Sequence, residues 1–155
     1  MIAVGIDTST KAIAIGCYGG TKKVDHHIYR LTGNNLNQQM AGAYNCMEQW
    51  LMEKRVEGKQ LKVFIEEPVY VQNQKVHMQL SCIYASVVLA CIGFNLFPEG
   101  VHNKTWKKEV LGNGNASKDD IAARSLLMFN IEGDCEQDIY DALCVAKYGW
   151  GEMGG

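Results

Sequence analysis

Four acidic residues lie where the predicted elements bring carboxylates toward one place. Asp7 ends an apolar run that starts at Ile2, Glu66 ends a second such run, and Asp138 and Asp141 lie three residues apart in a predicted helix. Oxygen-only ligands favour hard cations such as Mg²⁺ or Mn²⁺. Two such ions roughly 4 Å apart activate a water and stabilise the leaving oxygen of a phosphodiester. If the four side chains meet, the sequence predicts a hydrolytic site that uses two metal ions.

Each of these acids also has an ordinary interpretation. A carboxylate at a strand end is commonly solvated, and two acids spaced by three on a helix commonly belong to its polar face. Glu67 competes with Glu66, because neighbouring strand residues point to opposite faces of a sheet. We prefer Glu66 because it shares a face with Phe64 and comes first after the apolar run. Spacing alone leaves the choice between them open.

A basic stretch precedes the last two predicted helices. The net charge of −2 does not indicate nucleic-acid binding, but the distribution of charge matters more than the sum. The segment "VLGNGNASK" predicts a turn followed by the start of a helix, where free N–H groups suit phosphate, although solvated lysines are an equal alternative. It is not a P-loop, because G-x-x-x-x-G-K-[ST] is absent. Trp106, within this stretch, is expected to pack in the core rather than stack on bases. The basic residues are Lys104, Lys107, Lys108 and Lys118.

Length and composition indicate one soluble globular domain over residues 1–155, with 47% hydrophobic and 21% charged residues. Six cysteines without a C-x-x-C pattern indicate reduced thiols rather than a disulfide framework or a zinc site. No secretory signal is visible. The longest nearly uncharged run, 83–97, is shorter than the ~20 residues of a membrane span. We therefore expect a cytoplasmic protein without membrane contact.

Hydrophobic patterning predicts an α/β fold with a mixed sheet. The first three strands have tight joins, which implies an antiparallel meander. The first and fourth strands can be neighbours, which would place Asp7 and Glu66 at one rim, outside the carboxyl ends of the strands, where open sheets bind ligands. Strands are predicted for 2–7, 12–18, 24–30, 62–67 and 95–102. Helices are predicted from Leu36 to Trp50, capped by Asn34 or Asn35, and over about 75–93, 103–111, 118–130 (with a Ser117–Asp120 capping box) and 137–149.

The helix over 75–93 is apolar nearly all round from Leu80 and is therefore expected to be buried. Two interpretations stay open for it. It is either an ordinary core helix or a surface through which two copies of the chain associate.

Four segments together resemble the RuvC family of Holliday junction resolvases: "GIDTSTKAIAIG", "VFIEEP", "KKEVLGNGNASKDDIAA" and "DIYDALCVAKYG". The resemblance covers essentially the whole chain in order. It implies an RNase H-like fold, with a five-stranded mixed sheet flanked by helices. It also implies a homodimer that places one divalent-metal site on each of two opposed strands of a four-way DNA junction.

The resemblance also assigns roles to residues. An aromatic residue that acts against junction bases is expected shortly after the glutamate, and Tyr70 is the nearest candidate, although Pro68 and Val69 depart from the family pattern. Lys107 and Lys118 match the family's basic residues near the scissile phosphate, where Lys118 would offset developing charge. Lys104 and Lys108, in the same basic stretch of the sequence, are further candidates for DNA binding. The residues that match the catalytic carboxylates and metal ligands are Asp7, Glu66, Asp138 and Asp141.

The expected function is a Mg²⁺- or Mn²⁺-dependent endonuclease, with two ions per site, that resolves four-way DNA junctions by paired nicks. A broader flap or branched-DNA nuclease of the same fold is the first alternative. A nucleotide-binding domain of the actin and sugar-kinase type also has a first turn like "GIDTST". That class needs a second domain to close over ATP, so no nucleotide cofactor is expected. A catalytically silent DNA-binding protein would not need all four acids. The expected setting is a bacterial cell or a phage-infected host.

Overall fold

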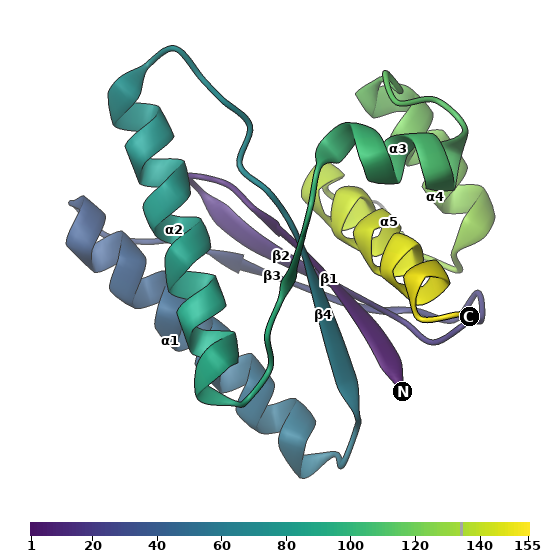
Figure 1. Ribbon diagram of the computed structural model, residues 1–155, viewed down its shortest axis with the longest axis horizontal. Helices are drawn as coiled ribbons and strands as arrows, with labels where there is room; N and C mark the ends of the chain where they lie inside the picture. Colours follow the sequence, from purple (N-terminus) through teal and green to yellow (C-terminus); the bar gives the residue numbers. More distant parts are fainter. Residues whose placement is uncertain (134) are drawn as a thin grey trace.

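A five-stranded mixed sheet forms the centre of the protein (Figure 1). In the computed structural model, which describes residues 1–133 and 135–155, the strand order is β3-β2-β1-β4-β5. β1 pairs antiparallel with β2 and β2 with β3, whereas β4 pairs parallel with β1 and with β5. The predicted meander and the neighbouring first and fourth strands are confirmed. The strands are β1 (Ile2–Thr8), β2 (Ala12–Tyr18), β3 (Asp25–Arg30), β4 (Leu61–Glu66) and β5 (Glu99–Val101).

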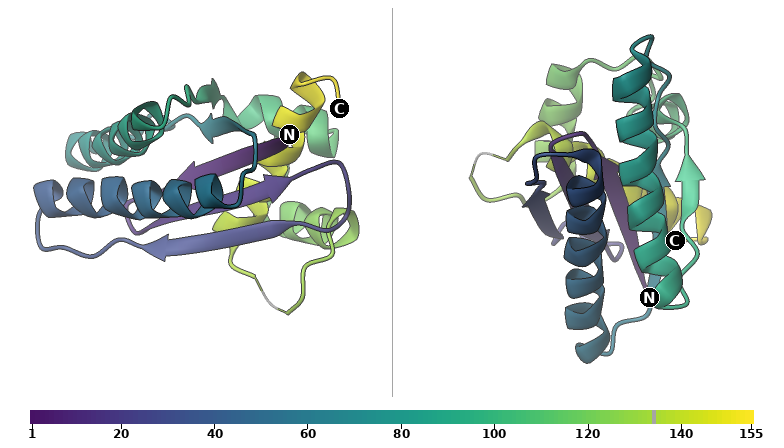
Figure 2. Two further views of the ribbon diagram at one scale, coloured as in Figure 1. Left: turned by 90° about the horizontal axis from the view of Figure 1, so that it is seen from below. Right: turned by 90° about the vertical axis from the view of Figure 1, so that its left-hand side faces the viewer.

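Helices cover both faces of the sheet (Figure 2). α1 (Leu36–Val56) and α2 (Gln74–Gly93) pack against each other on one face. α5 (Gln137–Glu152) lies across β1 and β2 on the other face, and α3 (Asn103–Leu111) and α4 (Lys118–Met128) pack on α5. The Asn35 side chain caps α1, and the predicted Ser117–Asp120 capping box starts α4.

Strand alternation divides the core of the protein into two clusters. On β1, Ala3 belongs to the cluster under α5, whereas Val4 and Ile6 belong to the cluster under α1 and α2. The period of two places the odd-numbered residues Gly5 and Asp7 on the same side as Ala3, the side covered by α5. No disulfide joins cysteines within the described residues, in agreement with the predicted reduced thiols.

α5 approaches the sheet very closely at two glycines. A Cβ atom on Gly5 would lie closer than 3.0 Å to backbone atoms of Ala142, Val145 and Ala146, and one on Gly16 would clash in the same way with the backbone of α5. Only residues without a side chain fit between the two backbones. The middle of α5 is therefore held directly over the middle of β1.

The strand predicted for 95–102 is wrong in length, because only three of its residues pair with β4. The preceding residues instead close the end of α2. Backbone N–H groups of Phe94 and Leu96 donate to the carbonyl of Cys91, and Asn95 adopts a positive φ of 59°. A chain that turns in this way cannot continue a ladder. α4 ends at Met128, before the predicted boundary, and α5 runs three residues beyond its predicted end.

α2 is less buried than its composition predicts. Its inner face, with Ile83, Val87 and Ala90, packs in the cluster shared with α1, but Leu89 is 58% exposed. Apolar composition does not reveal which side of a helix is covered, so the expectation of a buried helix is confirmed for the inner face and wrong for the outer face. Within the described residues α2 alone is long and apolar enough to cross a membrane, a property that core helices share.

Candidate active site

The four predicted carboxylates meet at one end of the sheet. Asp7 and Glu66 follow the paired residues Ile6 and Ile65, at the carboxyl ends of the parallel strands β1 and β4. Asp138 and Asp141 lie in the first turns of α5, which crosses β1. All four are half-buried. Burial raises the pKa of Asp7 well above its usual range, and the negative charges of the other three acids raise it further.

Glu66 rather than Glu67 belongs to this group. Burial raises the pKa of Glu66 to about 7, although the indole Nε1–H of Trp106 donates a 2.6 Å hydrogen bond to its Oε2 and opposes the shift. Glu67 is exposed and lies against Gly100 on β5. The alternation argument that favoured Glu66 agrees with this arrangement.

Two side chains that hold the acids were not predicted as site residues. Trp106 is fully buried, as expected, but its bond to Glu66 could not be inferred because the two residues are distant in sequence. Gln137 Nε2 donates to Asp141 Oδ1 at 3.1 Å, and burial raises the pKa of Asp141 to about 6. The spacing of four residues within a helix was a sequence signal for this second contact.

The four lysines divide into two pairs. The charge of Lys107 lowers the pKa values of Asp7, Glu66 and Asp141, and Lys118 acts in the same direction on Asp141. The other two lysines are exposed on α3. Their Cβ atoms, those of Lys104 and Lys108, lie on the side of α3 that faces Gly114.

Tyr70 lies in the connection between β4 and α2. Its side chain is 79% exposed, and its ring is tilted over His77 with the centroids 5.6 Å apart. The connection starts directly after Glu66, so Tyr70 is only four residues from an acid of the candidate site. It is accessible to a large substrate.

The donor chemistry of the acidic group fits divalent cations. The carboxylates repel one another and supply only oxygen ligands, which suits Mg²⁺ or Mn²⁺. In the described ranges, no three Asp, Glu, His or Cys side chains are already drawn together tightly enough to hold an ion. Binding would therefore require the four side chains, Asp7, Glu66, Asp138 and Asp141, to move closer together.

The raised pKa values predict how the stability of the metal-free protein depends on pH. Glu66 shifts from 4.5 to about 7 and Asp141 from 3.8 to about 6, so the folded state binds more protons than the unfolded state in this window. The free energy of unfolding contributed by these groups falls as pH rises from about 4 to about 7. Thermal unfolding in EDTA at several pH values checks this.

Other acids titrate in the opposite direction, so the comparison needs a matched variant. The pKa of Asp25 is lowered, chiefly by Lys54 against the opposing effect of burial. The pH profile of thermal unfolding measured for Glu66→Gln is subtracted from that of the wild type. This difference removes the contributions of acids such as Asp25, which are the same in both proteins. A wild-type profile that parallels that of Glu66→Gln between pH 4 and 7 would contradict the buried acidic group.

Trp106→Phe is expected to weaken Mg²⁺ binding at the acidic group by about tenfold to a hundredfold. Loss of an outer hydrogen bond to a metal-binding side chain typically has this size, and the variant removes the Nε1–H that donates to Glu66. Isothermal titration calorimetry with Mg²⁺ measures the change. Trp150→Phe is the control, because Trp150 lies near the C-terminal end of α5 and packs edge-on against Tyr18. Equal Mg²⁺ affinity of both variants would contradict the positioning role.

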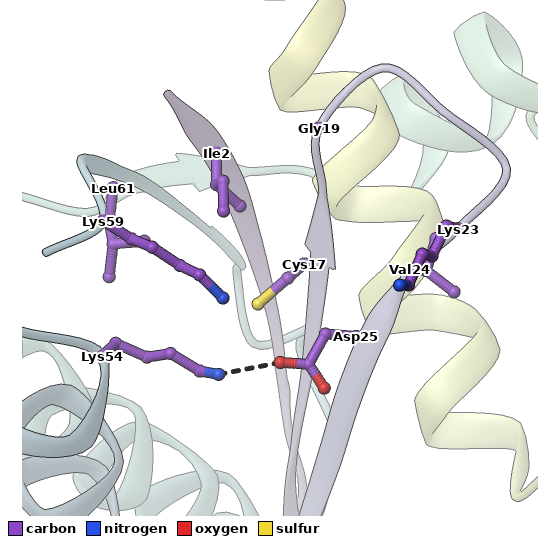
Figure 3. A pocket seen from close by; sticks show the side chains of 9 residues that line it. All are labelled: Ile2, Cys17, Gly19, Lys23, Val24, Asp25, Lys54, Lys59 and Leu61. Atoms are coloured by element: carbon purple, nitrogen blue, oxygen red, sulfur yellow. Dashed lines mark hydrogen bonds and ion pairs between the residues drawn. The ribbon is translucent and has the colours of Figure 1, made fainter. Parts of the chain in front are cut away.

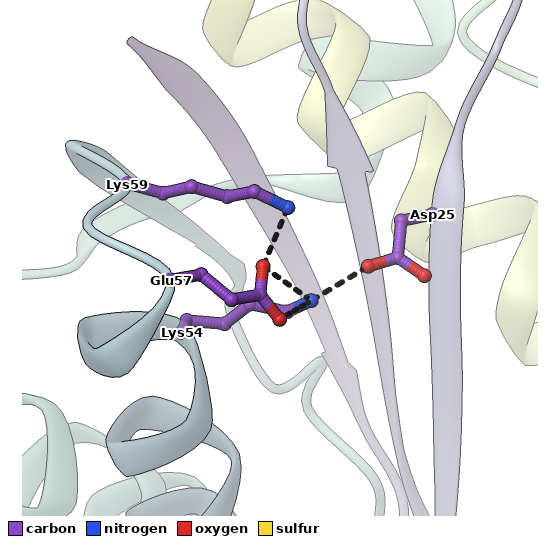
Figure 4. A network of polar contacts seen from close by, with 4 residues as sticks. All are labelled: Asp25, Lys54, Glu57 and Lys59. Atoms are coloured by element: carbon purple, nitrogen blue, oxygen red, sulfur yellow. Dashed lines mark hydrogen bonds and ion pairs between the residues drawn. The ribbon is translucent and has the colours of Figure 1, made fainter.

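Two cavities lie at the end of the sheet opposite the four acids. One, of about 220 Å³, is lined by Cys17, Lys54, Lys59 and Asp25 among others (Figure 3). Three of its charged side chains are paired within the protein. Lys54 Nζ lies 2.8 Å from Asp25 Oδ2 and 3.2 Å from Glu57 Oε1, and Lys59 Nζ lies 2.6 Å from Glu57 Oε2 (Figure 4). These contacts tie the end of α1 to the start of β3. The neighbouring cavity of about 480 Å³ lies between the ends of α1 and α2. Neither includes an acid of the candidate site.

Comparisons with known proteins agree with this arrangement. Residues 4–148 match the profile of the family described as Crossover junction endodeoxyribonuclease RuvC. A protein of that name from Chloroherpeton thalassium (strain ATCC 35110 / GB-78) is 24% identical over 155 residues, which is 96% of this chain and 81% of that protein. The Thermus thermophilus RuvC structure has a TM-score of 0.78 at 16% identity and covers 99% of this chain and 97% of its own. The structure of T. thermophilus RuvC in complex with a Holliday junction substrate gives a TM-score of 0.81 at 16% identity, with 99% and 96% covered. These two structures show that the RNase H-like fold is shared.

Proposed function

Because the chain belongs to the RuvC family of crossover junction endodeoxyribonucleases, it is a Holliday junction resolving endonuclease, and we propose that the acidic group is its catalytic centre. The observation that carries this proposal is the meeting of Asp7 and Glu66 on adjacent parallel strands with Asp138 and Asp141 of α5. The family match implies a divalent metal. That there are two ions per site is part of the proposal.

The proposed roles follow from the positions of the side chains. Bound cations would supply Lewis-acid activation of the attacking water and of the phosphodiester. Asp7 lies within electrostatic reach of all three other acids, so it would be a ligand shared by both ions. Glu66, oriented by Trp106, and Asp141, oriented by Gln137, would complete the ligand set together with Asp138. The products would carry 5′-phosphate and 3′-hydroxyl ends.

Basic and aromatic side chains around the acids are assigned to the DNA. The charges of Lys107 and Lys118 both lower the pKa of Asp141. Lys118 would offset charge at the scissile phosphate, and Lys107 would add to this positive charge. Lys104 and Lys108 are exposed on α3 and would contact phosphates further along the strand. Tyr70 is accessible for contact with junction bases.

A synthetic immobile four-way junction tests the function. The junction is labelled on each strand in turn and incubated with protein and Mg²⁺, Mn²⁺ or EDTA. Paired nicks on opposed strands that require metal are expected. Cutting of flaps and forks at the same rate would favour the broader branched-DNA nuclease. Binding without cleavage under every metal would overturn the catalytic assignment. We place the reaction in the cytoplasm of a bacterial cell or a phage-infected host.

The outer face of α2 supports association of two copies of the chain. Cys82, Ala85, Leu89 and Ile92 recur at alternating spacings of three and four residues, the pattern of a helix–helix seam. Two of these side chains, Leu89 and Ile92, are large, apolar and at least 41% exposed. Two nicks on opposed strands need two catalytic centres, so a second copy is the partner we propose for this seam.

Leu89→Lys is expected to raise the dissociation constant of this dimer by about 10²-fold or more. Facing like charges across an interface cost several kcal/mol, and each 1.4 kcal/mol corresponds to a factor of ten. Size-exclusion chromatography with light scattering measures the change. Leu127→Lys on α4, where the side chain is 75% exposed, is the control and should stay dimeric. A dimer that survives Leu89→Lys would exclude α2 as the interface.

A further inference from the structure

A groove of about 460 Å³ lies between the starts of α1 and α2. β1, β3 and β4 all run in the same direction. β2 is antiparallel to both β1 and β3, whereas β4 is parallel to β1. α1 follows β3 and α2 follows β4, so both helices begin at the end of the sheet where β1 ends (Figure 1). The groove therefore opens at the same end as Asp7 and Glu66, on the face covered by α1 and α2.

The lining of the groove is rich in side-chain amides. It includes one cation, Lys75, and its described residues include no carboxylate. Leu36 and Met78 supply apolar surface, and Met78 is 60% exposed. The amide residues are Asn34, Asn35, Gln39 and Gln79.

Two of these amides are joined across the helices. Gln79 Nε2 donates to Gln39 Oε1 at 2.7 Å, and both side chains are half-buried. Among the described residues, Gln39 Nε2 and Gln79 Oε1 have no protein partner. Exchanging the nitrogen and oxygen of both amides would preserve the bond between them and still leave one donor and one acceptor. The pair thus offers a donor beside an acceptor in either orientation.

We propose that this groove binds an unpaired nucleotide of the branched DNA, an inference that rests on the proposed function. The edge of a base carries donors and acceptors side by side, and glutamine amides pair with such edges. Leu36 and Met78 would contact the flat face of the base, and Lys75 would contact a phosphate. The groove is a second DNA contact, separate from the scissile phosphate, and it selects which nucleotide at the branch point is held out.

Exchange of the two amide orientations predicts the kind of selectivity. Because the Gln39–Gln79 pair can offer its donor and acceptor in either order, it would accept more than one base. A charged side chain at this position would offer only donors or only acceptors and would therefore accept fewer bases. The groove therefore favours unpaired nucleotides over paired ones more strongly than it favours one base over another.

The test is binding to a four-way junction in EDTA, with 2-aminopurine placed in turn at each nucleotide beside the crossover. The double variant Gln39→Met/Gln79→Met keeps side-chain length and removes the hydrogen bonds. We expect it to weaken binding about tenfold to a hundredfold and to change the 2-aminopurine fluorescence at one position. Lys75→Gln should lower the slope of log affinity against log salt by about one.

Gln49→Met is the matched control, because Gln49 is also on α1 and is bonded only to Glu53 among the described residues. It should bind like the wild type, and the thermal unfolding of all variants is measured alongside. Unchanged affinity and fluorescence in the folded double variant would overturn the groove assignment. Cleavage of the same junction by the wild type with Mg²⁺ is scored separately. Failure to cut counts against the proposed function, whereas loss of base contact in EDTA reports on the groove alone.

Discussion

Asp7→Asn is expected to lower the rate of junction cleavage by about 10³-fold or more, because a bound cation contributes several kcal/mol to stabilising transition-state charge and each 1.36 kcal/mol is a factor of ten in rate. The substitution removes the carboxylate that lies within electrostatic reach of all the other acids of the site. Single-turnover cleavage of a labelled junction measures the rate. Asp25→Asn, at the opposite end of the sheet, is the control and should cut normally.

Thermal unfolding distinguishes this loss from simple misfolding. Burial and three neighbouring negative charges raise the pKa of Asp7, so its ionised form destabilises the metal-free fold. Asp7→Asn should therefore raise the melting temperature in EDTA at neutral pH, and it should reduce the further rise that Mg²⁺ gives the wild type. A variant that cuts at the wild-type rate with an unchanged Mg²⁺ shift would show that Asp7 is not a ligand.

Gly5→Ala is expected to destabilise the fold by about 3 kcal/mol, at the upper end of the range for overpacking. The added methyl group would lie closer than 3.0 Å to three backbone atoms of α5, and backbone cannot rotate out of the way as a side chain can. Urea unfolding followed by circular dichroism measures the change. In the molecules that stay folded, α5 must lift from β1 and carry Asp138 and Asp141 away from Asp7, so cleavage should fall as well.

Gly19→Ala is the control for Gly5→Ala, because a Cβ atom at Gly19 would have nothing within 4 Å. It should leave stability nearly unchanged. Equal unfolding midpoints for the two variants would mean that α5 does not depend on the glycine at Gly5 for its position.

Much of the site could be predicted because it depends on local patterns. Asp7 and Glu66 each follow an apolar run, and the last residues of parallel neighbouring strands lie at the same end of the sheet. Glu66 was preferred to Glu67 because it shares a face with Phe64 and comes first after the apolar run, although spacing alone left the choice open. In contrast, the Trp106–Glu66 bond depends on how α3 docks against the end of β4, and no local pattern encodes that contact.

The fold was predicted least well where packing rather than composition decides. α2 is apolar enough to be fully buried, but the sheet and α1 cover only one side of it, which leaves Leu89 exposed. The segment before β5 is apolar enough for a strand, but hydrogen bonds to the last turn of α2 and the positive φ of Asn95 bend it away from β4. Both errors have the same origin, because the hydrophobicity of a segment does not specify which other element of the fold packs against it.

The contact between Trp106 and Glu66 gives the protein an internal fluorescent reporter. An indole whose N–H is bonded to a carboxylate emits differently once that carboxylate is neutralised by a cation, and Trp106 is shielded from bulk solvent, so its emission reports the local charge. Replacing Trp50 and Trp150 with phenylalanine would leave it as the single tryptophan. Arrival of a metal ion at the acidic rim could then be followed in real time, without label and before any strand is cut.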